Sequence, residues 1–493
     1  MTKRAAGILL PVTSLPSDYG IGCFSEQAYE FADILAESGQ GYWQILPIGP
    51  TGFGDSPYQS FSSYAGNPYL IDLGEFIKDG ILSESECKIP EERYIDYEYL
   101  YKTRFKLLYK AYEKSEKGKE FEEFKKQNQK WLDDYALFTA IKEQYGGAEW
   151  ISWDNDIKKR SGIGQYARKL WEKVEFYKFV QYKFYSQWNS LKKYVNSKGI
   201  KIIGDIPIYV SYDSADVWAN PELFCLDSKL LPTAVAGCPP DGFSPEGQLW
   251  GNPLYNWEVH RKDGFSWWIE RIRHSFELFD VLRIDHFRGF DKYYSIPFGS
   301  ENAKKGKWIK APGRELFETV ENSLGKPEFI AEDLGFVTDS VKELLNICGF
   351  PGMRVLQFAF DERDTGSTND YLPHNYIKNC VAYTGTHDNE TTAGWFCTLP
   401  DKAKKTVRKY LCDFYTPDEK MNLPLIGSVM RSSADLCIIP LQDYMGLGSE
   451  ARINTPSTLG NNWRWKLKKG ETDAGLINLI SDITAASGRR LEI

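Results

Sequence analysis

Eight short apolar runs recur along the 493-residue chain, and sequence of helical character separates them. The runs are AAGILL (5–10), GYWQILPI (41–48), GIKIIGDIPIYV (199–210), VLRIDHF (281–287), EFIAED (328–333), MRVLQFAF (353–360), CVAYTGTHD (380–388) and ADLCIIPLQD (434–443). Between the first two, residues 25–39 place apolar side chains at helical spacing and end in Gly39. Alternating strands and helices predict an α/β fold with a parallel sheet. Eight repeats predict one closed (β/α)8 barrel over residues 1–493.

Two spacings between these runs are too wide for a single crossover helix. Residues 51–198 are rich in Lys, Glu and Tyr, so we expect a mostly helical insertion between strands two and three. Residues 211–280 predict a second, loop-rich insertion between strands three and four. At its centre, eight of the 17 residues in 237–253 are Gly or Pro, which predicts a shaped loop and not a helix.

We expect the 237–253 loop to be an active-site loop, because barrels of this type carry functional loops over the carboxyl ends of their strands. It contains Asp241, Phe243, Gln248 and Trp250, a mixture that suits the apolar face and the hydroxyl rim of a sugar ring. A purely structural Ω-loop with a buried tryptophan is the alternative.

The overall composition disfavours several classes of partner. A net charge of −8 and a pI near 5.5 argue against nucleic acid or an anionic membrane as the main partner. The nine cysteines are an odd number without a CxxC pair, which suits a reducing compartment. No apolar run reaches membrane-spanning length, and the apolar part of residues 1–10 is too short for a signal peptide. We therefore expect a soluble, cytoplasmic protein.

Three of the predicted strands end in acidic residues, at Asp285, Glu332 and Asp388. Parallel strands joined by helices place all their carboxyl ends on one face, which is where α/β proteins bind ligands. Three carboxylates that converge there predict acid–base or nucleophilic chemistry on a polar substrate.

The fourth strand allows a more detailed argument. Side chains alternate along a strand, so Arg283 and Asp285 should both point to the barrel axis if Ile284 faces the helices. A nearby guanidinium should lower the pKa of Asp285 and keep it ionised, whereas Glu332 close to it should have a raised pKa and keep a proton. Two carboxyls of this kind, about 5–5.5 Å apart, are typical of a retaining glycosidase.

Asp388 would then stabilise the transition state by binding sugar hydroxyls. His387 and Asp388 cannot share a direction on an ideal strand, so one of them must lie at the strand end or in the loop.

Each of these patterns has a structural alternative. Arg283 and Asp285 could form a buried ion pair, and Glu332-Asp333 could cap the following helix. The stretch His387-Asp388-Asn-Glu390 could supply metal ligands. One such motif is weak evidence, whereas three in order on strands four, five and seven are stronger.

Four stretches of the sequence resemble a known family. They are GDIPIYV (204–210), VLRIDHFRG (281–289), AEDLG (331–335) and TGTHDNET (385–392). In this order they are similar to the four sequence regions of the α-amylase clan, whose catalytic domain is a TIM barrel. The match is closest to the 4-α-glucanotransferases, also called amylomaltases or disproportionating enzymes. Supporting motifs are GILLPVTSLPSDYGIG (7–22), WQILPIGPTGFGDSPYQSFSSYAGNPYLIDL (43–73), the 237–253 loop and RINTPSTLGNNWRW (452–465).

The resemblance implies a role for each matching residue. It implies that Asp285 is the nucleophile, Glu332 the general acid/base and Asp388 the transition-state stabiliser. The residues that would hold the sugars are Tyr58, Asp205, Trp250, Arg283, His387 and Asn454, and we add Gln248 from the loop. The family's barrel carries inserted subdomains and lacks the C-terminal β-domain of ordinary amylases.

Two departures from the wider pattern are informative. The first region ends in Ile-Pro-Ile-Tyr-Val, without the Asn-His of amylases, and amylomaltases share this difference. The stretch at 452 reads Arg-Ile-Asn where Arg-Met-Asn is expected, a swap of similar volume. No residue cluster demands calcium, so we expect neither a metal nor a cofactor.

The expected activity is retaining transfer of an α-1,4-glucan segment to the 4-hydroxyl of an acceptor sugar, through a glucosyl-enzyme on Asp285. The expected partners are maltooligosaccharides, longer α-1,4-glucans such as starch or glycogen, and glucose as an acceptor. An α-1,4-glucan hydrolase of the same clan is the nearest alternative. A metal-dependent barrel enzyme and a non-catalytic carbohydrate-binding protein are more distant ones.

Overall fold

Eight parallel strands close into a barrel, as the sequence predicts. The computed structural model describes residues 4–240, 245–335, 337–360 and 369–491. In sequence order the barrel strands are β1 (Ala5–Leu9), β2 (Tyr42–Gln44), β3 (Lys201–Pro207), β6 (Val281–Asp285), β9 (Phe329–Ala331), β10 (Gly352–Val355), β11 (Cys380–Tyr383) and β12 (Leu436–Pro440). Around the barrel they follow one another in that order, and β12 pairs with β1 from Ala5↔Leu436 to Leu9↔Pro440. All eight lie within or next to the predicted runs, so the (β/α)8 prediction is confirmed.

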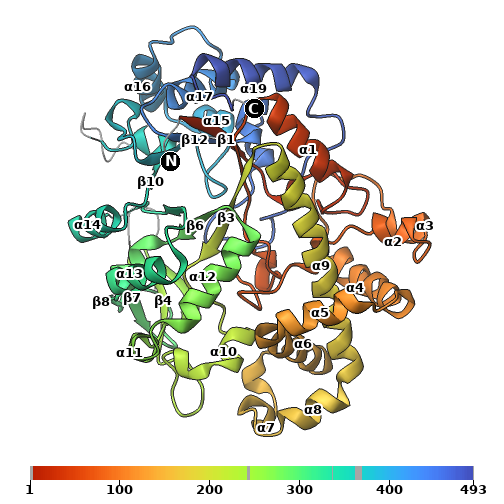
Figure 1. Cartoon of the computed structure of the whole chain (residues 1–493). Helices are drawn as coiled ribbons and strands as arrows, with labels where there is room; N and C mark the ends of the chain where they lie inside the picture. Colours follow the sequence, from red (N-terminus) through yellow and green to blue (C-terminus); the bar gives the residue numbers. More distant parts are fainter. Residues whose placement is uncertain (1–3, 241–244, 336, 361–368, 492–493) are drawn as a thin grey trace.

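Helices cover the outside of this barrel (Figure 1). They include α1 (Glu26–Glu37), α9 (Trp171–Ser197), α12 (Ser266–Leu278), α13 (Gly313–Leu324), α14 (Asp339–Cys348), α15 (Thr392–Thr398), α16 (Asp401–Leu411), α17 (Asn422–Met430), α18 (Leu441–Met445) and α19 (Ala474–Ala486). Among the described residues after β12 there are helices and turns but no further strand. No described helix is both long and apolar enough to cross a membrane.

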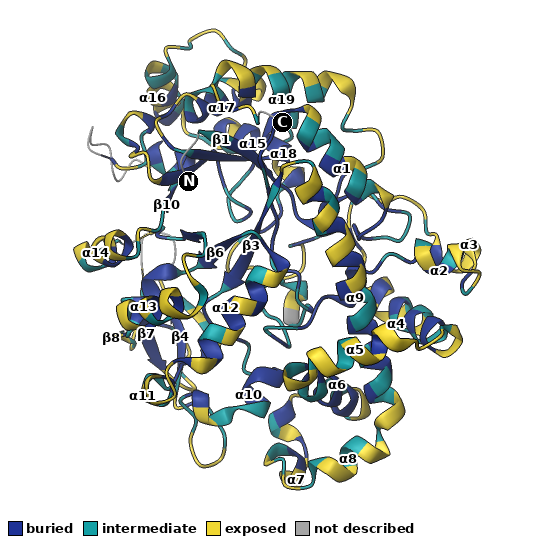
Figure 2. Cartoon of the chain, viewed as in Figure 1, coloured by how far each residue is buried: buried dark blue, intermediate teal, exposed yellow. Residues whose placement is uncertain are grey.

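The alternation of side chains along the strands divides the core in two. On β6, Val281 belongs to the cluster inside the barrel, while Leu282 and Ile284 belong to the cluster between barrel and helices. On β3, Ile203 points inside and Ile202 outside in the same way. Figure 2 shows the labelled barrel strands mostly in the colour of buried residues. Because successive side chains point to opposite faces, both faces of these strands are covered, which explains their continuous apolar runs.

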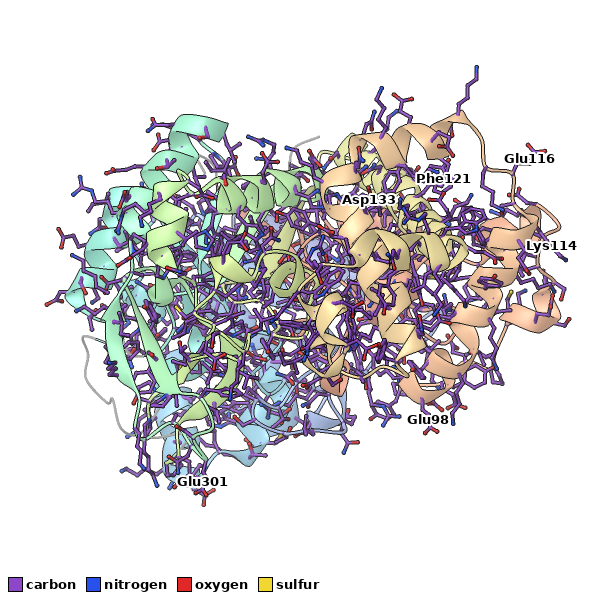
Figure 3. The ribbon with its side chains drawn as sticks, turned by 90° about the horizontal axis from the view of Figure 1, so that it is seen from below. Glu98, Lys114, Glu116, Phe121, Asp133 and Glu301 are labelled. Carbon is purple, nitrogen blue, oxygen red and sulfur yellow. The ribbon has the colours of Figure 1, made fainter. Side chains whose placement is uncertain are left out.

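Between β2 and β3 the chain forms a group of helices beside the barrel. They are α2 (Gly74–Lys78), α3 (Glu84–Cys87), α4 (Tyr97–Lys114), α5 (Lys119–Gln127), α6 (Gln129–Gln144), α7 (Asn155–Lys158) and α8 (Ile163–Lys169). Helix α9 has 27 residues and packs against α4, α5 and α6 as well as against α1 and β3. Figure 3 shows the labelled residues of this group, Lys114, Phe121 and Asp133, on the opposite side of the molecule from Glu301. One long helix therefore joins the inserted helices to the barrel.

A small antiparallel sheet lies beside the barrel and was not predicted from the sequence. It has the order β5-β4-β7-β8, with β4 (Ala234–Cys238), β5 (Gln248–Pro253), β7 (Lys292–Pro297) and β8 (Lys307–Lys310). Helices α10 (Ala215–Ala219) and α11 (Trp257–Lys262) flank β4 and β5 in sequence. The segment 237–253, predicted to be a loop, thus contains the end of β4 and all of β5. Its Asp241 and Phe243 lie outside the described residues.

Candidate active site

The three predicted catalytic carboxyls lie at the carboxyl ends of barrel strands. Asp285 is the last residue of β6, and Glu332 follows the last residue of the neighbouring strand β9. Main-chain hydrogen bonds hold the two segments together, since Glu332 N donates to Ile284 O at 3.0 Å and Phe287 N donates to Glu332 O at 3.0 Å. Asp388 lies in the turn that follows β11.

An arginine inside the barrel bridges two of the site's carboxylates. Arg283 and Asp205 are register partners on β6 and β3, and the Arg283 guanidinium donates to Asp205 Oδ2. The same Nη1 lies 3.2 Å from Asp285 Oδ1, and only 4% of the Arg283 side chain is exposed. Tyr58 Oη donates to Asp205 Oδ2 at 2.9 Å. The alternative of a buried ion pair is therefore correct as geometry, but the partner that Arg283 holds most closely is Asp205.

Two backbone amides hold the carboxyl group of Glu332. Its Oε2 accepts from His286 N at 2.7 Å, and its Oε1 accepts from Leu334 N at 3.1 Å. His286 has a φ of 54°, a left-handed conformation that is uncommon for a non-glycine residue and turns its N–H toward Glu332. The backbone thus fixes Glu332 beside Asp285.

Asp333 does not cap the next helix, contrary to one sequence-based alternative. Helix α14 begins at Asp339, and its N-cap residue is Thr338. Asp333 is buried instead, where its carboxylate accepts from Met353 N at 2.6 Å and pairs with Arg354 at 3.2 Å. The Asp333 side chain therefore links the loop after β9 to strand β10 and does not contact helix α14 as a cap.

His387 and Asp388 both lie in the loop after β11, so the strand alternation does not constrain them. Asn454 Nδ2 donates to Asp388 Oδ1 at 2.6 Å, and His387 Nε2 lies 3.3 Å from the same oxygen. Arg452 Nη2 donates to Asp388 O at 2.8 Å. The His387 ring stacks on Tyr58, with 5.2 Å between ring centroids and an interplanar angle of 18°. The 452–465 motif therefore orients the third carboxyl.

Metal ligation by His387, Asp388 and Glu390 is not supported. Glu390 lies 3.5 Å from Arg452, and it accepts from the amide of Thr391. Within the described parts of the chain, no group of three or more His, Cys, Asp or Glu side chains could hold a metal ion.

Trp250 and Gln248 lie on β5, where the small sheet meets the barrel mouth. Trp250 Nε1 donates to Gln248 Oε1 at 2.9 Å. The Trp250 ring is half-buried and meets the edge of His286, with 4.8 Å between centroids and an interplanar angle of 88°. These contacts place Trp250 and Gln248 beside the Asp285–Glu332 pair.

Two residues of the site were not predicted. His286 supplies an amide to Glu332 and a ring to Trp250. Trp463 lies 5.8 Å from Tyr58 and 5.9 Å from His387, measured between ring centroids. His286 lies in the motif 281–289 and Trp463 in the motif 452–465. Membership of these motifs was the signal in the sequence that could have identified both as site residues.

The electrostatics of the pair differ from the sequence-based expectation. Burial raises the pKa of Asp285 well above its ordinary value, Arg283 opposes this rise and the charge of Glu332 adds to it. Burial also raises the pKa of Glu332, against Arg283 and the two backbone amides. The expected lowering of the Asp285 pKa is therefore wrong, because burial outweighs the effect of Arg283. Burial keeps the two histidines uncharged, lowering the pKa of His286 to about 3 and that of His387 below its ordinary value.

Three buried polar atoms in the site have no hydrogen-bond partner within the described structure. They are Asp205 Oδ1, His286 Nε2 and His387 Nδ1. Such atoms are costly unless a ligand satisfies them. The site as a whole combines two neighbouring carboxyls, a third carboxylate and unsatisfied polar groups. It can attack, protonate and hold a polyhydroxylated substrate.

Comparison with known proteins gives a consistent result. The profile of a family described as 4-alpha-glucanotransferase matches residues 10–472. The chain is 47% identical over 489 residues to a 4-alpha-glucanotransferase of Clostridium butyricum, covering 97% of this chain and 99% of that one. It is 46% identical over 481 residues to the one of Thermus thermophilus, covering 95% of each. Among solved structures, an amylomaltase from Streptococcus agalactiae in complex with acarbose superposes with a TM-score of 0.95 at 41% identity, covering 99% of this chain and 100% of that one.

Proposed function

The chain belongs to the 4-alpha-glucanotransferase family and catalyses glucan transglycosylation, and we propose that it does so through a covalent intermediate on Asp285. The observation that carries this proposal is that Asp285 and Glu332 lie side by side at the ends of neighbouring strands, each with a pKa raised by burial. We further propose maltooligosaccharides and longer α-1,4-glucans, including starch or glycogen chains, as donors and glucose as an acceptor. We propose a reducing, cytoplasmic compartment, since the nine cysteines are an odd number without a CxxC pair.

The first step forms the intermediate. An Asp285 carboxylate oxygen attacks the anomeric carbon of the donor, and the bond from that carbon to the glycosidic oxygen breaks. The departing oxygen keeps the electron pair and takes the proton of Glu332. The two amides on Glu332 fix its carboxyl group for this transfer.

The second step releases the product. The ionised Glu332 removes the proton of the acceptor's 4-hydroxyl, and that oxygen attacks the anomeric carbon. The ester bond to Asp285 breaks, which restores its carboxylate. Two inversions give net retention, and the proton that Glu332 gives to the departing oxygen in the first step is replaced by the proton of the acceptor hydroxyl in the second.

The surrounding residues are proposed to bind the sugar at the scissile bond. Asn454 holds Asp388 so that its carboxylate can bind hydroxyls of the donor sugar in the transition state. Asp205, Arg283, Tyr58 and His387 would bind the same sugar, which is supported by the unpartnered Asp205 Oδ1 and His387 Nδ1.

Transfer requires that water does not reach the intermediate before the acceptor does. Trp250 and His286 form an aromatic wall beside the carboxyl pair, with Gln248 bonded to the indole. We propose that this wall and a bound acceptor sugar together exclude water. The wall favours transfer over hydrolysis.

Incubation with maltotriose tests the reaction class. A transferase converts maltotriose into glucose plus chains longer than the substrate, whereas a hydrolase gives glucose and maltose alone. Asp285→Asn keeps the shape of the side chain but removes the nucleophile, so transfer should fall on the order of 10⁴-fold or more. Persistent transfer by a folded Asp285→Asn protein would overturn the role of Asp285.

A further inference from the structure

A second concavity lies on the flank of the barrel, away from the catalytic centre. We call it the flank groove and define it by its lining, which comes from α12 on one side, from α5, α6 and α9 on the other, and from α10. Figure 1 shows where these helices lie. It encloses about 1030 Å³, at the upper end of the range for ligand sites in proteins. Asp285, Glu332 and Asp388 do not line it in the described structure.

Aromatic side chains from four separate segments meet in this groove. Trp131 lies 5.7 Å from His274 and 5.8 Å from Tyr185, between ring centroids. The rings of Tyr64 and Trp131 are nearly parallel, at 14° with 6.2 Å between centroids. Both Tyr64 and Trp131 are only half-buried, unlike the core tryptophans. They give the groove an aromatic surface that a ligand can reach.

Polar groups without net charge also line the groove. Five of the lining side chains are amides, namely Gln127, Asn128, Gln129, Asn189 and Asn220. An amide both donates and accepts hydrogen bonds, as a sugar hydroxyl does. Asn128 already holds the Trp131 indole, whose Nε1 donates to its Oδ1 at 3.1 Å. Asn189 is exposed, one helical turn beyond Tyr185 on α9.

The charged side chains that line the groove favour some classes of ligand over others. Six acidic side chains line it, against three from lysine or arginine. This excess of acids disfavours phosphates, nucleotides and nucleic acid. The amides and carboxylates disfavour an apolar peptide or lipid, because burying them without partners is costly. A neutral polyhydroxylated chain satisfies both conditions.

One segment connects the groove to the catalytic cleft. Residues 57–65 carry Tyr58 at the cleft end and Tyr64 at the groove end. Tyr64 O accepts from Tyr185 Oη, and His274 Nε2 lies 3.2 Å from the same carbonyl. Ser63 N donates to Asp216 on α10 at 2.8 Å. Tyr185, His274 and Asp216 thus anchor the segment that places Tyr58 on Asp205.

We propose that the flank groove binds a segment of α-1,4-glucan outside the catalytic centre. The inference rests on the proposed function, because it takes the enzyme's own substrate as the ligand. Aromatic rings stack on the apolar faces of the glucose units, and the amides bind their hydroxyls. A chain held there raises the local concentration of donor ends at the cleft. The groove therefore acts on long glucans and has no effect on short ones.

Two substitutions test the groove, with one control. Asn189→Trp fills the groove from an exposed position, and Trp131→Ala removes an aromatic face. Trp171→Ala is the matched control, because Trp171 is 62% exposed on α9 and does not line the groove. Each protein is run in native gels containing glycogen, and KM is measured for amylose and for maltotriose.

The groove variants should migrate with less retardation in glycogen, and their KM for amylose should rise roughly two- to tenfold. Their kcat/KM for maltotriose should stay within about twofold of the wild type, and Trp171→Ala should behave as the wild type throughout. Unchanged retardation and KM in Asn189→Trp would overturn the proposal, even if Trp131→Ala fails to fold. An equal loss in the control would overturn it too. Failure of the wild type to disproportionate maltotriose would contradict the proposed function instead.

Discussion

The charge at Asp285 is set by burial more than by its arginine neighbour. Arg283 lies 3.2 Å from Asp285, but the same guanidinium nitrogen also serves Asp205, which is fully buried. One cation cannot compensate several carboxylates in a recessed site. The raised pKa of both carboxyls favours retention of a proton in the site, and the first chemical step needs that proton on Glu332.

This arrangement predicts a cost in stability that depends on pH. Because burial raises the pKa of Asp285 in the folded state, the folded protein binds this proton more tightly than the unfolded chain. Below about pH 4 Asp285 is protonated in both the folded and the unfolded state, so it does not change the free energy of unfolding. As the pH rises toward the folded pKa, Asp285 lowers that free energy. Asp285→Asn cannot ionise, so its Tm should exceed the wild-type Tm by about 1–3 °C at pH 7.

The thermal scans should be repeated at several pH values, and the difference should disappear toward about pH 4. Asp482→Asn, at an exposed position on α19, serves as the control and should leave Tm unchanged at every pH. A lower Tm for Asp285→Asn at pH 7 would mean that the ion pair with Arg283 outweighs the burial of the carboxyl.

The residue-level predictions from sequence succeeded where a strand sets the direction of a side chain. Arg283 and Asp285 point into the barrel because the alternation on β6 requires it. Side chains whose positions depend on turns were harder to predict from the sequence. The contact of Asp333 with Met353 depends on how the loop after β9 folds, and the amide of His286 depends on a left-handed turn. Neither leaves a periodic signal in the sequence.

At the scale of elements, the barrel strands were predictable because they are apolar on both faces. The small sheet was not, because its strands are short and contain glycine and proline. Strand β4 reads AVAGC and β5 reads QLWGNP, a composition typical of a loop. Strand β5 nevertheless carries Trp250 and Gln248 into the site. The prediction for 237–253 therefore placed Gln248 and Trp250 near the candidate site, but it was wrong about their local structure, since both lie on a strand.

The outer face of β3 depends on a glycine. Gly204 points toward the covering helices, and an added Cβ would lie 2.2 Å from the ring of Phe279, a buried residue that follows α12. Gly204→Ala should therefore force β3 and Phe279 apart and destabilise the protein by about 1–3 kcal/mol. Urea unfolding followed by circular dichroism measures this change.

Gly164→Ala is the matched control, since an added Cβ on α8 meets nothing within 4 Å. It should be neutral or slightly stabilising, because alanine favours a helix over glycine. The unfolding midpoint of Gly204→Ala should fall well below that of Gly164→Ala. Equal midpoints would show that Phe279 and α12 can move away from β3 with little loss of unfolding free energy. The close packing of Gly204 against Phe279 would then not be needed for stability.

At the scale of the whole molecule, the ends of the barrel strands carry the candidate catalytic carboxyls, and the longer segments between strands carry the side chains that surround them. The nucleophile and the acid/base candidates come from β6 and β9, whereas Tyr58, Trp250 and Asn454 come from the segments after β2, β3 and β12. The inserted helices α5 and α6 also form one side of the flank groove. Long α9 connects these parts, so the groove and the barrel share one rigid helix.

The central claim is a covalent glucosyl intermediate on Asp285, and trapping it tests this claim most directly. Glu332→Gln cannot deprotonate an acceptor, so a donor with a good leaving group, such as α-glucosyl fluoride, should load the enzyme without turning over. Mass spectrometry of the intact protein should then show the mass of one added glucosyl unit, located by proteolysis on the peptide that contains Asp285. A glucosyl unit on another residue, or full transfer activity in Asp285→Asn, would contradict the account.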